Sequence, residues 1–340
     1  MRALVLSEPR KVADHPLHLA DLPEPTVGPG ELLLEVAACA VCRTDLQLAE
    51  GDLEAHLLPV VPGHQAVGRV VTVGLGVDGW SPGDRAGAYW LFGTDGTCRF
   101  CRSGRENLCE AAEFTGWDRN GGFADRMVVR ADVAVRIPAR FDDLAAAPLL
   151  CGGVIGYRAL KISGIEPGGR LGLYGFGASA LLCLQVARHW GCEVHVRARS
   201  EGERRRALSL GAASVGAYDD PTPHPLDAAI TTAPVGDVVV AALRAVDRGG
   251  IVAVNAIHLD GIPAFPYELL WHERQLRSVA NVTRRDAAEF MAVAAEIPIR
   301  TETQTFPLEA GNDALEAVAM GQVGGAAVLT MGSGGATPGW

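Results

Sequence analysis

The sequence of 340 residues lacks the features that mark membrane, secreted or nucleic-acid-binding proteins. It contains no run of about 18 apolar residues, so neither a transmembrane helix nor a membrane partner is expected. The opening residues reach Glu8 too soon for a signal peptide, and we therefore expect a soluble, cytoplasmic protein. Positive charge is not in excess, because 30 Lys and Arg stand against 40 Asp and Glu. The net charge of −10 disfavours binding to nucleic acid or to anionic lipid.

Internal repeats and low-complexity segments are also absent from the body of the chain. Hydrophobic residues make up 48% and charged residues 21%, which is typical of a folded globular protein. The length is large for a single hydrophobic core and favours two domains. Only residues 332–340, which are rich in glycine, are expected to form a flexible tail.

The pattern of apolar and turn residues divides the chain into three parts. Residues 1–148 contain short alternating runs broken by Gly and Pro, which predicts an antiparallel β domain. Residues 149–280 alternate strands with helices, which predicts βαβ units and a parallel sheet. Residues 281–331 are expected to return to the first domain. The fold class is therefore α/β, with elements expected at 171–174, 178–190, 193–197, 203–210, 227–231, 250–254, 286–296 and 326–329.

The eight cysteines are expected to be reduced, so their spacing carries the information. Cys98, Cys101 and Cys109 lie within twelve residues, and the Cys-x2-Cys pair lets two sulfurs reach one tetrahedral ion. Asp95 lies three residues before Cys98 and could donate an oxygen ligand. The alternative is a metal-free surface loop, but three cysteines this close together favour zinc.

A second set of metal-ligand residue types is dispersed along the chain. Cys42, His64 and Cys151 offer two thiolates and one imidazole, which suit a catalytic zinc that keeps its fourth position open. Taken singly, each has a stronger alternative: a lone Cys is usually a small buried hydrophobe, and a lone His is usually structural. Spacing alone therefore supports this set only weakly.

A glycine-rich segment follows the strand expected at 171–174. It has the G-x-G-x-x-A pattern, and a helix is expected to begin within it. The bare backbone of such a loop lets a pyrophosphate approach the helix N-terminus. This context predicts a dinucleotide-binding site formed by Gly175, Gly177, Ala178, Ser179 and Ala180.

Four segments in this order resemble the zinc-dependent alcohol dehydrogenases of the medium-chain dehydrogenase/reductase superfamily. The resemblance extends over residues 1–331 and implies a GroES-like catalytic domain, a Rossmann domain and an active-site cleft between them. It also implies that Cys42, His64 and Cys151 hold a catalytic zinc and that the segment 95–109 holds a structural zinc. Relatives form homodimers or homotetramers. The segments are Cys42-Arg43-Thr44-Asp45, Gly104-Arg105-Glu106-Asn107-Leu108-Cys109, Pro148-Leu149-Leu150-Cys151-Gly152 and Gly175-Phe176-Gly177-Ala178-Ser179.

The resemblance also implies individual roles. Thr44 matches the hydroxyl that exchanges the substrate proton, and Arg43 matches the residue that meets the cofactor pyrophosphate. Asp45 is expected to accept from the outer nitrogen of His64 and so to fix the imidazole. Trp90 lies where the family lines its substrate pocket, although packing in the core is the alternative for this residue.

Three positions depart from the family pattern. Gln65 replaces the Glu that usually follows the zinc-binding His, which removes a negative charge beside the metal. Gln47 replaces a proton-relay His, and an amide cannot accept a proton near neutral pH. Asp95 replaces the first Cys of the structural lobe and keeps its charge. These changes place fast alcohol oxidation in doubt.

The end of the second expected strand bears on the cofactor. An NAD-binding fold normally has an acid there to accept from the ribose 2′-hydroxyl. Here the place falls near Ala198, without an acid, and Arg199 follows at once. A 2′-phosphate would meet guanidinium groups, including those of the run Arg204–Arg206, although that run is also explained as a solvated helix face. We therefore expect NADP(H) in preference to NAD(H).

Three functions remain open at this point. The leading hypothesis is a zinc-dependent oxidoreductase acting on a small alcohol, aldehyde or ketone, with two zinc ions per chain. Gln47 and Gln65 motivate a second one, the reduction of a conjugated carbon–carbon or imine bond in a biosynthetic pathway. A third is a non-enzymatic sensor on a retained scaffold, which loss of a catalytic zinc ligand would favour; none is lost.

Overall fold

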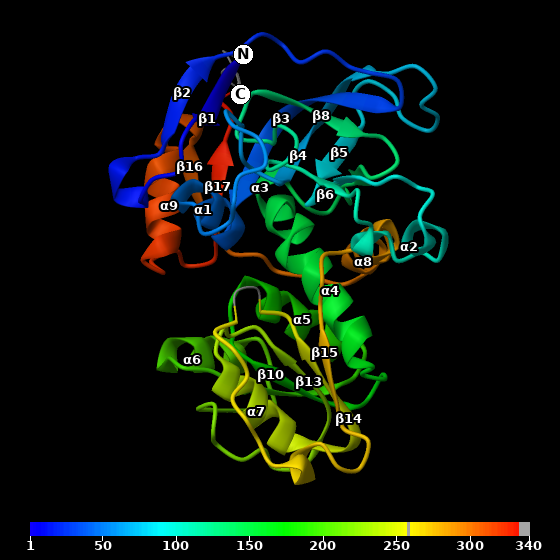
Figure 1. Ribbon diagram of the computed structural model, residues 1–340, viewed down its shortest axis with the longest axis vertical. Coiled ribbons are helices and arrows are strands. Elements are labelled where there is room, and N and C mark those ends of the chain that lie inside the picture. Colours follow the sequence, from blue (N-terminus) through cyan, green and yellow to red (C-terminus); the bar gives the residue numbers. More distant parts are fainter. Residues whose placement is uncertain (257–258, 333–340) are drawn as a thin grey trace. The chain divides into compact units, whose positions relative to one another are not determined.

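The structure is a computed structural model that describes residues 1–256 and 259–332 (Figure 1). It contains two compact units. Unit 1 comprises Met1–Cys151, Val282–Ala295 and the described residues from Arg300 on, and unit 2 comprises the described residues of Gly152–Asn281 together with Glu296–Ile299. The predicted fold class is confirmed, since one unit is rich in β structure and the other is a parallel sheet with helices. Of the expected flexible tail, residues 333–340 lie outside the described residues.

Unit 1 is built around a seven-stranded sheet in the order β16-β17-β3-β4-β5-β9, with β8 also paired to β3. Most neighbours are antiparallel, as the turn pattern predicts, but β16 and β17 pair in parallel at one edge. Two smaller sheets join β1 to β2 and β6 to β7. The strands are β1 (Arg2–Leu6), β2 (Leu17–Asp21), β3 (Glu31–Val41), β4 (Gln65–Val73), β5 (Arg85–Ala88), β6 (Leu91–Gly93), β7 (Glu113–Phe114), β8 (Arg126–Arg130), β9 (Val135–Arg136), β16 (Thr303–Pro307) and β17 (Ala326–Thr330).

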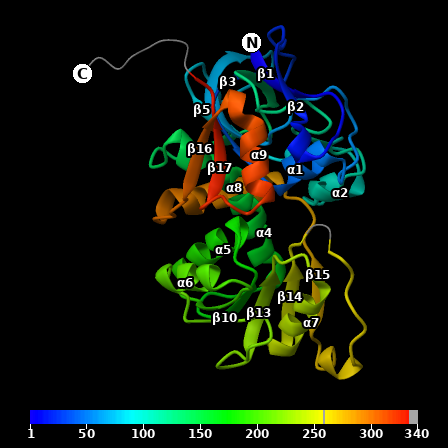
Figure 2. The same ribbon diagram turned by 90° about the vertical axis from the view of Figure 1, so that its left-hand side faces the viewer.

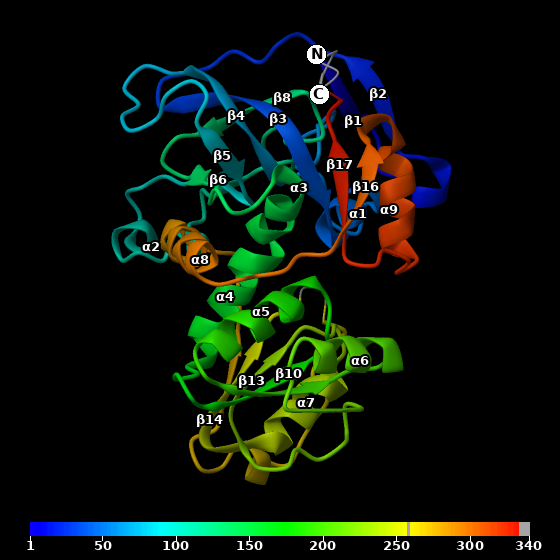
Figure 3. The ribbon, with the colours of Figure 1, turned by 180° about the vertical axis from the view of Figure 1, so that it is seen from behind.

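Short helices surround this sheet. Helix α9 packs along β16 and β17, as Figures 2 and 3 show. The amide N–H of Arg284 in α8 donates to the Glu106 carboxylate, which fastens this returning segment to unit 1. The helices are α1 (Arg43–Glu50), α2 (Arg99–Arg102), α3 (Asp143–Ala146), α8 (Arg284–Glu296) and α9 (Gly311–Ala319), with 3-10 turns at Val12–Asp14, Glu106–Leu108, Ala147–Leu150 and Leu308–Ala310.

Unit 2 is a doubly wound parallel sheet in the order β12-β11-β10-β13-β14-β15. The order reverses direction beside β10, where such sheets bind ligands at the carboxyl ends of their strands. Its central strands are almost wholly buried, which explains their apolar sequences. The strands are β10 (Arg170–Tyr174), β11 (Glu193–Arg197), β12 (Ser214–Gly216), β13 (Leu226–Thr231), β14 (Val246–Val254) and β15 (Gln275–Ser278).

Helices cover both faces of this sheet (Figures 1 and 2). Helices α4 and α5 pack closely together, because a Cβ at Gly156 would lie 2.8 Å from the Cys183 sulfur. On the opposite face, α7 packs over a core that includes Tyr174 and Leu226. The chain from 217 to 225 joins β12 to β13 without a helix, and prolines at 221, 223 and 225 explain why. The helices are α4 (Gly152–Ser163), α5 (Ala178–His189), α6 (Glu201–Ser209) and α7 (Gly236–Ala245), with a 3-10 turn at Tyr267–Leu269.

Within the described part of the chain, no single helix combines the length and apolar character needed to cross a membrane. One bent pair of consecutive helical segments, Asp143–Leu150 with Gly152–Ser163, meets that test by length and composition only.

Candidate active site and metal sites

The position of His64 is set by a turn that only glycine tolerates. Gly63 has a φ of +96°, and a Cβ there would lie 2.4 Å from the ring of Phe123. The turn directs the chain into β4, and the His64 side chain is buried at the start of that strand. Substitution of Gly63 would therefore displace the imidazole.

Cys42 and Asp45 both belong to the start of α1. Cys42 is the N-cap residue, and its amide N–H donates to Asp45 Oδ2 at 2.9 Å. The other oxygen, Oδ1, lies 3.3 Å from His64 Nδ1, which is the partnership expected from the sequence. With Nδ1 turned to the carboxylate, His64 Nε2 lies 3.5 Å from Cys42 Sγ. Asp45 thus fixes both the backbone of one candidate ligand and the ring of the other.

Cys151 completes this group. It follows the 3-10 turn Ala147–Leu150, and its sulfur and the ligand atoms of Cys42 and His64 all lie within 4.8 Å of one another. Ligands of a tetrahedral zinc ion are separated by about 3.3 to 3.8 Å, given zinc–sulfur and zinc–nitrogen bonds of about 2.3 and 2.0 Å. The donor set and its spacing therefore suit a zinc ion held by three protein ligands.

The electrostatics of this group are those of a cation site. Burial lowers the pKa of His64, but the Asp45 carboxylate and the Cys42 sulfur outweigh it and raise that pKa to about 10. A hydrogen bond from Cys151, against the effect of burial, holds the pKa of the Cys42 thiol well below its ordinary value. The same hydrogen bond, together with burial, raises the pKa of Cys151. A metal ion that binds this group would therefore displace protons from it, because the ligand forms are thiolates and a neutral imidazole.

The second group of candidate ligands forms a separate lobe of unit 1. The ligand atoms of Asp95, Cys98, Cys101 and Cys109 lie within 4.8 Å of one another, and the Cys98 and Cys101 sulfurs are 3.5 Å apart. Asp95 Oδ1 accepts from the amide N–H groups of Thr97 and Cys98. Those hydrogen bonds, the one from Cys98 above all, hold the pKa of Asp95 well below its ordinary value, so it is a carboxylate at neutral pH. Three sulfurs and a carboxylate suit a closed structural zinc site.

Three further predicted residues lie on α1. Arg43, its first residue, is exposed, while Thr44 and Gln47 are partly buried. Thr44 and Gln47 are three residues apart and so share one side of the helix. Gln65 is buried at the start of β4, where its side-chain amide donates to the Ala40 carbonyl at 3.3 Å.

Trp90 contacts the candidate catalytic site directly. Its indole meets the His64 ring edge to face, with ring centroids 5.0 Å apart and planes at 79°. It also stacks on Phe114 and Trp117, and His56 stacks on Trp117. Phe114, Trp117 and His56 are not predicted from the sequence. The only signal was the aromatic pair three residues apart in Phe114-Thr115-Gly116-Trp117, which does not show that the hairpin brings it back to Trp90.

The glycine-rich segment lies between β10 and α5 in unit 2. Gly175 has a φ of +96°, and a Cβ there would lie 2.5 Å from Thr232 Oγ1. Gly177 is the N-cap of α5 and makes no side-chain cap, and a Cβ there would meet nothing within 4 Å. Ala178, Ser179 and Ala180 form the first turn of the helix. The helix N-terminus is therefore open to an anionic ligand, as a pyrophosphate site requires.

Arg199 follows β11 and is exposed. The neighbouring arginines are engaged: Arg204 Nη1 donates to the carbonyls of Ala198 and Arg199, and Arg205 pairs with Glu201. Arg197, by contrast, is buried and donates to the carbonyls of Asp220 and Pro221. No acid lies at the end of β11, as the sequence shows.

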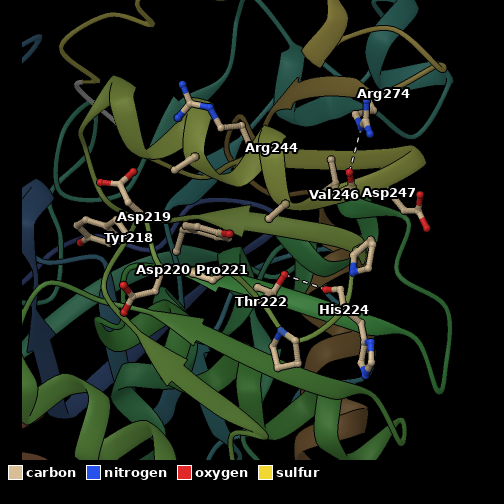
Figure 4. A pocket seen from close by; sticks show the side chains of 15 residues that line it. Tyr218, Asp219, Asp220, Pro221, Thr222, His224, Arg244, Val246, Asp247 and Arg274 are labelled. Atoms are coloured by element: carbon tan, nitrogen blue, oxygen red, sulfur yellow. Dashed lines mark hydrogen bonds between the residues drawn. The ribbon is translucent and has the colours of Figure 1, made fainter.

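A hollow of about 530 Å³ lies in unit 2 and contains none of the predicted site residues. Figure 4 shows its mixed lining, with Asp219 and Asp220 on the loop before β13, Arg244 on α7, and Arg274 donating to the Val246 carbonyl. Charges of both signs line it, and it includes no member of the two candidate metal-ligand groups or of the glycine-rich loop. We therefore locate the chemistry at the two groups described above and not in this hollow.

Comparison with known proteins finds that this chain is similar to alcohol dehydrogenases. The family of alcohol dehydrogenase GroES-like domains matches residues 28–139. The chain is 47% identical over 335 residues to the Mycobacterium tuberculosis protein named "Probable alcohol dehydrogenase AdhA", with 97% of each chain covered. An alcohol dehydrogenase of Geobacillus stearothermophilus is 33% identical over 340 residues, covering 97% of this chain and 99% of the relative.

Solved structures share the whole fold. The cinnamyl alcohol dehydrogenase SbCAD4 of Sorghum bicolor superposes with a TM-score of 0.87 at 26% identity, covering 97% of both chains. Acetophenone reductase of Geotrichum candidum, in complex with NAD, gives 0.85 at 26% and 97% of both chains. A Sinorhizobium meliloti protein bound to NADP gives 0.84 at 27%, covering 97% of this chain and 99% of that one. These names do not choose between the two cofactors, and they do not favour reduction of a conjugated carbon–carbon or imine bond.

Proposed function

The chain belongs to the zinc-dependent alcohol dehydrogenases of the medium-chain dehydrogenase/reductase superfamily, and on that premise we propose that it transfers hydride between a nicotinamide cofactor and a small alcohol or carbonyl compound. The observation that carries the proposal is the convergence of the ligand atoms of Cys42, His64 and Cys151 within 4.8 Å. A group of two partly buried thiols and a buried imidazole, drawn from three segments between positions 42 and 151, has no evident structural purpose without a metal ion.

Two zinc ions per chain are proposed. Cys42, His64 and Cys151 would hold the catalytic ion, and the lobe of Asp95, Cys98, Cys101 and Cys109 would hold the structural one. When bound, the catalytic zinc supplies a Lewis acid for the substrate oxygen, and the nicotinamide supplies or accepts the hydride.

Residues of α1 would orient the site and handle the proton. Asp45 holds His64 Nδ1, so the imidazole keeps the ring position and tautomer that leave Nε2 for the metal. The Thr44 hydroxyl, partly accessible on the same helix, would give its proton to the substrate oxygen during carbonyl reduction and take it back during alcohol oxidation. Gln47 can accept a hydrogen bond but not a proton, which favours carbonyl reduction near neutral pH.

NADP(H) is the proposed cofactor. The open N-terminus of α5 at Gly177 is suited to the pyrophosphate, because unpaired N–H groups and the helix dipole attract anions. Arg199 is exposed directly after β11, and no acid ends that strand. Its neighbours Arg204 and Arg205 already have backbone and carboxylate partners, so we assign the 2′-phosphate contact to Arg199.

The experiment that tests the function is Cys42→Ser, assayed with a panel of alcohols and aldehydes and both cofactors. Turnover is expected to fall more than about 100-fold with the loss of roughly one zinc per chain, because a weaker oxygen ligand replaces a thiolate. Cys192→Ser is the matched control, since Cys192 belongs to neither ligand group and its thiol donates to the Glu166 carbonyl. Full activity in Cys42→Ser, or no turnover of any panel substrate by the native holoenzyme, would defeat the proposal.

A further inference from the structure

Three partly buried aromatic rings stack on one another in unit 1 and form what we call the aromatic wall: Trp90, Phe114 and Trp117. Their ring centroids are 5.1 to 5.7 Å apart, and their planes lie within 18° to 30° of one another. Each ring is only partly buried, whereas the nearby core residue Phe123 is fully buried. Aromatic side chains that gather at the surface instead of in the core indicate a place where a ligand binds.

The wall is held firmly by the backbone. Phe114 ends β7, where it pairs opposite Leu91 of β6, next to Trp90. The Thr115 amide N–H donates to the Trp90 carbonyl at 2.9 Å. Trp117 Nε1 donates to the Glu54 carbonyl at 2.8 Å, which fixes the rotation of that indole. The rings are therefore preorganised and do not need to rearrange when a flat ligand stacks on them.

One end of the wall meets the proposed catalytic zinc ligand His64, through the edge-to-face contact of Trp90. At Trp117 the stack continues into an imidazole. The His56 ring lies 3.9 Å from the Trp117 ring, with planes at 23°. The wall thus leads from the proposed site of hydride transfer to a polar side chain that can form hydrogen bonds.

His56 is held in one orientation by Asp118. His56 Nδ1 lies 2.7 Å from Asp118 Oδ1, and Asp118 Oδ2 accepts from the Phe114 amide N–H at 2.8 Å. A carboxylate can only accept, so in the neutral imidazole Nδ1 carries the proton and Nε2 keeps its lone pair. Among the residues that the structure describes, none makes a hydrogen bond to His56 Nε2, and the side chain is about half exposed. The imidazole is therefore ready to accept from a hydroxyl.

We propose that the substrate is an aromatic or conjugated aldehyde, or the matching alcohol, that stacks on the aromatic wall and donates a remote hydroxyl to His56 Nε2. The proposal rests on the oxidoreductase function proposed above and assigns its substrate class. Trp117 supplies stacking surface, and His56 with Asp118 determines specificity at the end remote from the reacting carbon. The negative charge of Asp118 disfavours a carboxylate at the same place.

The test measures kcat/KM of the zinc-loaded protein for 4-hydroxy and 4-methoxy forms of benzaldehyde and cinnamaldehyde. The two substituents affect the carbonyl similarly, but only the hydroxyl can donate a hydrogen bond. The two parent aldehydes sample different distances from the reacting carbon to the hydroxyl. For at least one parent aldehyde, we expect the ratio of kcat/KM for the hydroxy form to kcat/KM for the methoxy form to be about 2- to 10-fold lower in His56→Leu than in the native protein. This decrease is the effect of losing one hydrogen bond. Because the same ratio is compared between two proteins, the difference in size between the hydroxyl and methoxy groups cancels.

Three further variants sharpen the result. Asp118→Asn should lower the same ratio, because an amide that donates to Nδ1 turns Nε2 into an N–H donor. His18→Leu changes an exposed histidine on β2 and should leave the ratio at its native value. Trp117→Leu is expected to lower kcat/KM for both aromatic parents relative to propanal.

Equal ratios in native protein, His56→Leu and Asp118→Asn for both parents, with propanal and the aromatic aldehydes all turned over, would overturn this inference and leave the oxidoreductase function intact. Failure of the native protein to reduce any of these aldehydes, propanal included, with either cofactor would instead count against the function itself. Melting temperatures of each variant show whether the fold has survived.

Discussion

At the scale of single residues, the site depends on which atom each partner leaves available. Asp45 takes His64 Nδ1 and leaves Nε2 toward Cys42, and Asp118 takes His56 Nδ1 and leaves its Nε2 open. The same chemistry, a carboxylate that can only accept, thus orients both the imidazole proposed as a metal ligand and the one proposed as an acceptor. The residue types were visible in the sequence, but the choice of nitrogen is a property of the folded chain.

Asp95 offers the first test at this scale. One of its oxygens accepts from two backbone amides, which leaves the other for a metal ion. We expect about two zinc ions per chain in the native protein and about one in Asp95→Ala, with a lower melting temperature, because three thiolates alone leave the structural site incomplete. Elemental analysis of the purified chain checks this. A native value near one, with Cys98→Ser harmless to stability, would show that the lobe holds no zinc.

Gln47 offers the second test at the scale of residues. It lies on α1 three residues after Thr44, partly buried on the same side of the helix. Gln47→His is expected to raise the rate of alcohol oxidation near neutral pH more than the rate of carbonyl reduction, because an imidazole can carry away the proton that an amide cannot. Initial rates in both directions test it, with Gln47→Leu to separate the relay from the loss of a hydrogen bond. An unchanged oxidation rate in Gln47→His contradicts the relay argument.

At the scale of elements, the sequence predicted the positions of helices and strands well, but it predicted contacts between distant segments poorly. Helix α5 and strands β10, β11 and β13 lie within a residue or two of the expected ranges, because apolar runs bounded by glycine determine them. Helix α1 was not predicted, since its eight residues are too few and too polar for a periodic signal. The stacking of Phe114 and Trp117 on Trp90 was also missed, because the hairpin register that causes it is non-local. Spacing predicted the lobe of Asp95, Cys98, Cys101 and Cys109, whereas the set of Cys42, His64 and Cys151 came mainly from the resemblance, because its members are dispersed along the chain.

The turn between β11 and α6 carries a prediction about the cofactor. Arg199 is exposed there, and no carboxylate ends β11. We expect the native protein to have the higher kcat/KM with NADPH than with NADH, and Arg199→Ala to lower that preference about 10-fold or more, the effect of a charge-assisted hydrogen bond. Arg205→Ala is the control, because Arg205 pairs with Glu201. A native preference for NADH, or an unchanged ratio in Arg199→Ala, would reject this assignment.

At the scale of the whole molecule, each unit contributes a separate part of the chemistry. All seven candidate metal ligands belong to unit 1, although they come from positions between 42 and 151. The open helix N-terminus and Arg199 belong to unit 2. The division follows from the two kinds of sheet, because a sheet with tight turns gathers ligands from distant loops, while a doubly wound parallel sheet presents helix N-termini at its carboxyl edge.

At this scale, one edge of the sheet in unit 2 bears on how copies of the chain assemble. Strand β15 ends the six-stranded sheet and, among the described residues, pairs only with β14, so one side of its backbone is unpaired. The two residues at its carboxyl end are exposed. The preceding segment exposes Tyr267 and Trp271, at 66% and 54%. An exposed edge strand beside large aromatic residues favours pairing with another chain, and a second copy related by a two-fold axis satisfies both features at once.

We therefore predict a homodimer formed along β15, or a homotetramer built from such dimers. Trp271→Asp is expected to raise the dissociation constant at least about 10-fold, because it places a charge in an apolar contact. Light scattering of the native protein and the variant over a dilution series measures this. Leu75→Asp is the matched control: Leu75 is 83% exposed in a turn of unit 1 and should leave the assembly unchanged. A native protein that stays monomeric at micromolar concentration would exclude the edge pairing, and equal weakening by both substitutions would place the interface elsewhere. If the prediction is right, the unpaired amides of β15 become protected from hydrogen exchange in the native assembly and lose that protection in Trp271→Asp, since strand pairing and assembly are then the same event.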